Sequence, residues 1–161
     1  MSQKTQFATL FRYHFDTTER LMDQAGKLPE DDYREDLGIK WGSVHELLLH
    51  ILATDQGYRV ALETGHRPAP LKAEDYPGLT ALRGLLEEER EGMTAYLQEL
   101  TEPSIEETAE LQAGPARTIA LPRWHFLNHL LFHGMQHQAD IAARLTRFGH
   151  SPGDLDFIFY R

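Results

Sequence analysis

The chain has 161 residues, of which 41% are hydrophobic, and this predicts a single domain over residues 1–161 with one core. A formal net charge of −9 argues against nucleic acid or an anionic membrane as its main partner. Cysteine is absent, which excludes disulfides, a thiol nucleophile and thiolate metal ligands, and is consistent with a reducing cytoplasm. No apolar run approaches the ~18 residues of a membrane span, and the N-terminus lacks the pattern of a signal peptide.

Apolar residues recur at helical spacing in the first part of the chain and predict a first helix over about residues 3–25. The following segment, residues 26–42 (GKLPEDDYREDLGIKWG), has turn formers at both ends and is predicted to be a loop. Ser43 and Glu46 have the spacing of a capping box, so we expect a second helix to begin there. Its apolar stripe ends at residues 64–70 (TGHRPAP).

The second half of the chain predicts two further helices. Leucines at helical spacing indicate a third helix over about residues 79–100. Residues 101–121 contain the stretches AELQAG and RTIALP, which we expect to be short extended segments. Pro122 then lies near the first turn of a long fourth helix, where proline is tolerated, and Gly149 ends this helix after Phe148.

Four long amphipathic segments without a strand-rich block predict an all-α fold, a four-helix bundle. The long second and third connections leave the order of helix directions open. The tail GDLDFIFYR is apolar for a chain end, so we expect it to pack on the bundle or on a second subunit. This tail, together with Trp124 near the start of the fourth helix, favours a homodimer.

The fourth helix carries a ladder of histidines within the stretch HFLNHLLFHGMQHQAD: His125, His129, His133 and His137. Each four-residue step advances ~40° around a helix and ~6 Å along it. Relative to the centre of the apolar stripe, His137 lies roughly 50° away and His133 roughly 90°. His129 lies roughly 130° and His125 roughly 170° away, so these two are predicted to face solvent or a partner.

The last two rungs of the ladder are therefore the best candidates for metal ligands. Histidines four residues apart on a helix can bind one ion together. Two ligands rarely make a tight site, so we expect a third from a facing helix, and His50 lies beside the apolar stripe of the second helix. Asp55 and Asp140 are weaker candidates, either as ligands or as hydrogen-bond acceptors for the ligating imidazoles.

A structural explanation competes with metal binding for every histidine, because a histidine at the edge of a bundle is usually just hydrogen-bonded. We expect His45, His66 and His150 on the surface or in loops. His14, on the first helix, is predicted to have a structural role, although it could line the same cavity as the ligands.

Three motifs give the chain a family resemblance. The stretch SVHELLLHILATDQG is similar to a pattern S-V-x-E-L-x-x-H-I, and the fourth helix carries H-x-x-x-H. The tail GHSPGDLDFIFY matches G-x-x-P-x-x-x-D-x-x-x-Y. Over nearly its whole length the chain resembles the DinB-like (YfiT-like, DNA-damage-inducible) superfamily of metalloenzymes.

This resemblance implies an up-up-down-down four-helix bundle, often dimeric, that holds a metal ion with one histidine of the second helix and two of the last. By position these are His50, His133 and His137, the same three that the helical projection favours. The family commonly continues with Arg-Gly-Gln after its final histidine, whereas residues 138–140 here are Gln-Ala-Asp. A substrate that depends on that arginine would be bound less well here.

Three neutral imidazoles leave a divalent ion its full charge and an open coordination position, which suits activation of water or of a thiol. Zinc, nickel, iron and copper all accept histidine ligands. By resemblance, the expected activity is that of a metal-dependent transferase or hydrolase acting with a low-molecular-weight thiol or water on a small-molecule electrophile. Asp55, Asp140 and His14 are candidate proton acceptors, and spacing alone identifies no general base.

Two other classes of function remain open at this point. A non-catalytic stress-response or interaction protein would use the histidines structurally, or would bind a metal only to brace the bundle. A ligand carrier or sensor would have a deep apolar cavity and no open metal position.

Overall fold

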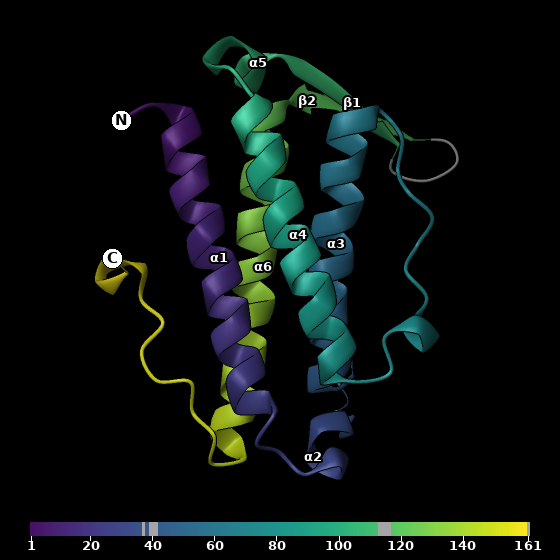
Figure 1. Cartoon of the computed structure of the whole chain (residues 1–161), viewed down its shortest axis with the longest axis vertical. Helices are drawn as coiled ribbons and strands as arrows, with labels where there is room; N and C mark the ends of the chain where they lie inside the picture. Colours follow the sequence, from purple (N-terminus) through teal and green to yellow (C-terminus); the bar gives the residue numbers. More distant parts are fainter. Residues whose placement is uncertain (37, 39–41, 113–116, 161) are drawn as a thin grey trace.

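A computed structural model describes residues 1–36, 38, 42–112 and 117–160 of the chain, and it confirms an all-α four-helix bundle (Figure 1). The four long helices are α1 (Gln3–Ala25), α3 (Val44–Thr64), α4 (Leu79–Glu99) and α6 (Arg123–Arg147). The shorter elements are α2 (Glu30–Arg34), α5 (Glu102–Glu106), the strands β1 (Thr108–Gln112) and β2 (Thr118–Pro122), and the 3-10 helices η1 (Ala73–Asp75) and η2 (Phe157–Phe159).

The order of helix directions differs from the up-up-down-down arrangement that the resemblance implies. Figure 1 shows α1 and α6 running in one direction and α3 and α4 in the other. Hydrogen bonds agree with α1 antiparallel to α4, because Lys4 bonds to the carbonyl of Gln98 while Arg83 pairs with Asp23. Since α3 runs parallel to α4, the order is up-down-down-up. The connection between α3 and α4 is long enough to return the chain along the bundle, and this allows the parallel pair.

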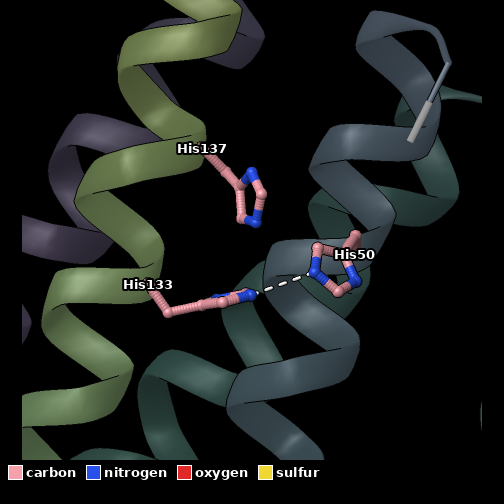
Figure 2. A group of neighbouring side chains, drawn as sticks. All are labelled: His50, His133 and His137. Atoms are coloured by element: carbon pink, nitrogen blue, oxygen red, sulfur yellow. Dashed lines mark hydrogen bonds between the residues drawn. The ribbon is translucent and has the colours of Figure 1, made fainter. Parts of the chain in front are cut away.

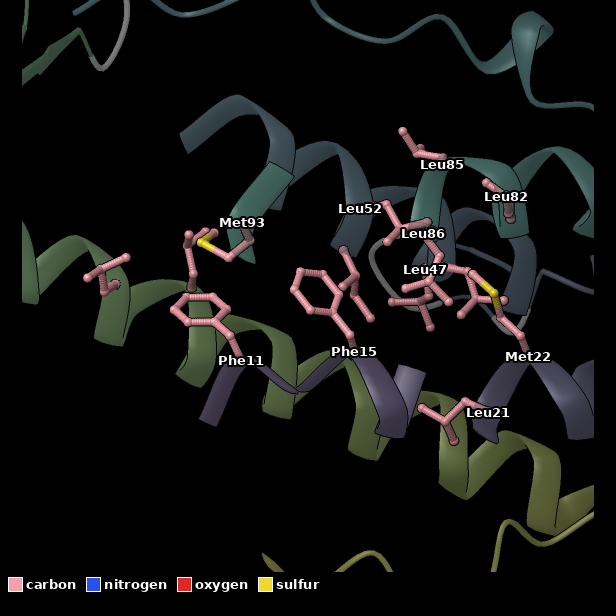
Figure 3. Packing of buried hydrophobic residues seen from close by; sticks show 14 of the residues in the cluster. Phe11, Phe15, Leu21, Met22, Leu47, Leu52, Leu82, Leu85, Leu86 and Met93 are labelled. Carbon is pink, nitrogen blue, oxygen red and sulfur yellow. The ribbon is translucent and has the colours of Figure 1, made fainter. Parts of the chain in front are cut away.

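Each long helix packs against two neighbours in the bundle. α1 and α3 each contact both α4 and α6, so α1 and α3 lie diagonally opposite one another. The core between them consists of apolar side chains from all four helices, several of which are drawn in Figure 3. Phe11 and Phe15 of α1, Leu47 of α3 and Met93 of α4 are each at most 2% exposed.

The helix ends follow the local sequence signals. The predicted capping box is present, since the Ser43 hydroxyl accepts from the backbone N–H of Glu46 and the Glu46 carboxylate accepts from that of Ser43. Gly65 ends α3 with a φ of 80°, a left-handed conformation that favours glycine. Pro122 is the N-cap of α6, and Phe148 is its C-cap. These boundaries confirm the predicted helix limits within a few residues.

The connections were predicted less accurately. Residues 26–42, expected to be a loop, contain the short helix α2, which is too brief to show a helical period in its sequence. The two predicted extended segments form an antiparallel hairpin in which Leu111 pairs with Ile119. Residues 113 and 114, at the end of the first segment, lie outside the described residues.

The C-terminal tail packs along α1, in agreement with one of the two predicted arrangements (Figure 1). The Tyr13 hydroxyl donates to the carbonyl of Leu155, and its ring lies 5.1 Å from that of Phe157. The Tyr160 hydroxyl donates to Asp16. In the part of the chain that is described, no helix has the length and apolar character that a membrane crossing requires.

Candidate metal centre

Three histidines from two antiparallel helices converge between α3 and α6. His50 projects from α3, and His133 and His137 project from successive turns of α6 (Figure 2). Their ring centroids lie 4.8 Å (His50 to His133), 4.9 Å (His50 to His137) and 4.5 Å (His133 to His137) apart. Each ring offers one nitrogen, and these three atoms all lie within 4.8 Å of one another. The structure thus brings together the three residues predicted as ligands.

The spacing fits one divalent ion. Two nitrogens that bind the same ion at about 2.1 Å lie no more than about 4.2 Å apart, so slight ring rotations are sufficient. His50 Nε2 and His133 Nε2 are only 3.0 Å apart, and a hydrogen bond between them accounts for one proton at most. The Nδ1 atom of His133, which would carry the proton when Nε2 binds the ion, is buried and has no hydrogen-bond partner among the described residues. A cation shared by the three rings would satisfy the lone pairs that face one another.

His133 is held in the neutral form that a metal ligand needs. Burial lowers its pKa to about 3, and the neighbouring imidazoles of His137 and His50 act in the same direction. A protonated imidazole here would be desolvated and would lie beside two further rings that can also carry positive charge. The site therefore favours lone pairs over protons at neutral pH.

Asp140 contacts the triad from the next turn of α6. Its Oδ2 atom lies 3.3 Å from Nδ1 of His137, an arrangement in which Nδ1–H donates to the carboxylate. This bond leaves Nε2 of His137 free to accept a metal and fixes the orientation of the ring. The structure thus places Asp140 where the predicted role as an acceptor requires it, and Asp140 lies outside the group of candidate ligands.

Asp55 and His14 form a separate polar network in the core. His14 Nε2 donates to Asp55 Oδ2 at 2.9 Å, which joins the diagonal helices α1 and α3. Gln138 of α6 donates to Nδ1 of His14 at 3.2 Å and to the hydroxyl of Thr18 at 2.8 Å. These bonds join α6 to the same network. All four residues are at most 3% exposed. These contacts agree with the predicted structural role of His14, and they direct Gln138 toward α1.

Four of the remaining histidines lie at or near the surface, and the fifth is buried. The exposed ones are His66, His125 and His129, and His150 is half-buried after the end of α6. His45 is only 5% exposed, contrary to the expectation of a surface position. Its Nδ1 atom accepts from the hydroxyl of Tyr33, because α2 folds over the start of α3.

Two residues near the histidine group, Tyr58 and Arg67, are not among the predicted site residues. The Tyr58 ring lies 5.2 Å from that of His129, which in turn lies 5.8 Å from that of His133. The guanidinium of Arg67 is 4.5 Å from the Tyr58 ring centroid. Tyr58 follows His50 by two helical turns, so the helical period was a signal for its position. Arg67 lies beyond the end of α3 and gave no such signal.

A comparison with protein families decides the relationship of the chain. The DinB family model matches residues 1–161. The chain belongs to the DinB family. Among curated proteins there is no match.

The DinB fold is also found in a solved structure. A crystal structure of a DinB-like protein, YjoA from Bacillus subtilis, superposes with a TM-score of 0.64 and 22% sequence identity. The match covers 91% of this chain and 93% of the other. At this identity the similarity concerns the fold, and the site is argued from the residues of this chain.

Proposed function

We propose that this DinB-family protein binds one divalent metal ion through His50, His133 and His137 and uses it to activate a thiol or water against a small electrophile. The convergence of the three ring nitrogens within 4.8 Å of one another carries this proposal. The expected reaction is of the thiol S-transferase or hydrolase type. The absence of cysteine in the chain supports a cytoplasmic location, where low-molecular-weight thiols are reduced.

The metal would supply a Lewis acid that lowers the pKa of a bound thiol or water. The side chains present suit this chemistry in two ways. His50 and His133 are only partly buried, so a small molecule can approach them from solvent. Asp140, whose side chain is 41% exposed, orients His137 and can also accept a proton from an incoming group. His14 is less suitable as a base, because both of its ring nitrogens are engaged.

Zinc, nickel and iron are the metals that we expect, since each accepts imidazole ligands. The test is the metal content of untagged protein, measured by plasma mass spectrometry after purification and after reloading. We expect about one divalent ion per chain. The substitutions His133→Ala and His137→Ala should abolish it, whereas His125→Ala, which removes an exposed rung of the same ladder, should retain it.

A wild-type protein that stays metal-free after reloading would overturn the proposal, as would stoichiometric metal in a variant that lacks all three histidines. If metal binds but a thiol never coordinates it, the non-catalytic alternative is favoured, in which the ion braces α3 against α6. Substitution with cobalt(II) distinguishes these cases, because thiolate coordination changes its visible spectrum.

We also propose that the protein is a homodimer. Exposed large apolar side chains gather along α6 and the C-terminal tail: Phe132 (63%), Met135 (55%), Phe157 (46%), Ile158 (83%) and Phe159 (68%). Phe132, Met135 and Phe157 line a hollow of about 440 Å³ between α1, α6 and the tail. Contiguous apolar surface of this kind is typical of an interface with another protein.

A further inference from the structure

A second cavity begins one helical turn after the candidate ligand His50. It has a volume of about 240 Å³ and lies between α3 and residues 67–71 of the following segment. On the helix side it is lined by Ala53, Thr54, Gln56, Gly57 and Tyr58. Four of these residues follow His50 by three, four, seven and eight positions, the spacing of residues on one face of a helix, and Gln56 lies at the edge of that face. The cavity therefore lies along the same face of α3 that presents His50.

Contacts between rings connect this cavity to the candidate metal centre. Tyr58 lines the cavity and contacts His129, and His129 contacts the ligand His133. Arg67 closes the far end, with its guanidinium 4.5 Å from the Tyr58 ring centroid. The four side chains Arg67, Tyr58, His129 and His133 thus form a continuous series of contacts. The positive charge of Arg67 lies at one end of this series and the candidate metal site at the other.

Arg67 has the properties of an anion-binding residue. Its side chain is exposed, and no carboxylate of the described residues lies within ion-pair distance of it. Arg59 and Arg83, by contrast, each pair with an acidic residue, as expected in a chain with a net charge of −9. Pro68 restricts the backbone conformation of Arg67, and stacking on Tyr58 orients the guanidinium. Planar guanidinium groups held in this way bind carboxylates in bidentate geometry.

We propose that Arg67 binds the carboxylate of a substrate whose reactive atom lies at the His50–His133–His137 site. The identity of that reactive atom rests on the proposed function, whereas the anion site depends only on Arg67 and its cavity. Eight residues of α3 separate His50 from Tyr58, which corresponds to about 12 Å along the helix. A matching substrate is a thiol with a carboxylate far from its sulfur, and in glutathione the γ-glutamyl carboxyl carbon is eight bonds from the cysteine sulfur, about 10 Å when fully extended. The cavity beside Arg67 is lined by both polar and apolar groups and would hold the carboxylate-bearing end of such a molecule.

The test compares glutathione with its dimethyl ester on cobalt(II)-loaded protein, by the visible spectrum of the metal. We expect Arg67→Gln to weaken glutathione binding about five- to tenfold and to leave the affinity for the ester unchanged. Arg147→Gln is the matched control, because Arg147 is another exposed arginine stacked on a ring, at 5.9 Å from Phe148. Equal losses for the acid and the ester, or no loss for either, would overturn the assignment of Arg67.

A second measurement separates this inference from the proposed function. S-methylglutathione retains both carboxylates but cannot form a thiolate, and its binding to metal-free protein can be followed through the NMR signals of the Tyr58 ring. Binding to the wild type that is weakened in Arg67→Gln supports the anion site, even if no thiol ever coordinates cobalt. If S-methylglutathione does not bind the wild type, or binds the variant equally well, the anion site is refuted independently of the metal chemistry.

Discussion

Gly134 of α6 lies directly against the ring of His14 on α1. A β carbon at position 134 would be 2.3 Å from His14 Cε1 and 2.6 Å from Nδ1, closer than any side chain allows. The His14 ring cannot turn away easily, because Asp55 and Gln138 hold its two nitrogens. The absence of a side chain at position 134 is therefore what lets α1 approach α6 immediately beside the candidate ligand His133.

We expect Gly134→Ala to destabilise the protein despite the better helix propensity of alanine. Forcing a methyl group into a packed interior costs about 1–3 kcal/mol, which exceeds the gain of up to about 1 kcal/mol from replacing a helical glycine. Urea unfolding followed by circular dichroism measures the difference. Gly84→Ala on α4 is the control: no described atom lies within 4 Å of where its added methyl group would be, and it should be neutral or stabilising. A Gly134→Ala protein as stable as the Gly84→Ala protein would contradict this packing argument.

A buried ion pair joins α3 to α4. Arg59 donates to both carboxylate oxygens of Glu89, at 2.7 and 2.9 Å, and Glu89 is 0% exposed. Replacing Arg59 with methionine leaves this carboxylate without its partner, and we expect a loss of about 3–5 kcal/mol in the free energy of unfolding. Burial raises the pKa of Glu89, so the variant should be less destabilised at acidic pH, where Glu89 takes up a proton.

The second ion pair of Arg59, with Glu63, provides the control for this prediction. Arg59 also pairs with Glu63, whose side chain is 30% exposed. Glu63→Gln should cost no more than about 0.5 kcal/mol, as expected of a partly exposed pair four residues apart on a helix. The double variant Arg59→Met, Glu89→Gln should recover much of the stability, because no charge remains buried. If Arg59→Met and Glu63→Gln have equal effects, the buried pair is not the stronger contact.

His45 predicts how stability depends on pH. Burial lowers its pKa below the ordinary value of 6.5, and the positive charge of Arg34 acts in the same direction. The unfolded chain therefore binds a proton at higher pH than the folded chain does. The contribution of His45 to stability is complete above pH 6.5 and is lost as the pH falls toward the lowered folded-state pKa. Protonation would also remove the acceptor for the Tyr33 hydroxyl.

Unfolding curves at about pH 7.5 and at about pH 5 test this linkage in metal-free protein. We expect the wild type to lose more stability over this interval than His45→Asn, whose amide oxygen can accept from Tyr33 without titrating. His66→Asn is the control, since His66 is exposed. Identical pH dependence in the wild type and His45→Asn would show that His45 is not the group involved.

The success and failure of the sequence predictions have physical reasons. The convergence of His133 and His137 could be predicted because their positions follow from the period of one helix, and that of His50 because it lies beside an apolar stripe. The burial of His45 depends on α2, and a helix of five residues has no detectable period. Arg67 reaches Tyr58 only because the chain reverses after α3, where Gly65 has a φ of 80°, so its position beside Tyr58 is a property of the folded chain.

The exposed apolar residues of α6 predict the assembly state. If Phe132 and Met135 lie at a homodimer interface, replacing both with glutamate should give a monomer, because burying two carboxylates against apolar surface is unfavourable. Light scattering after size-exclusion chromatography at micromolar concentration measures this. Gln136→Glu, at an exposed position next to Met135, adds a charge without removing apolar surface and should weaken the dimer less. The double variant should retain its metal, because neither residue belongs to the histidine group. A wild-type monomer, or a dimer that survives both glutamates, would exclude this face as the interface.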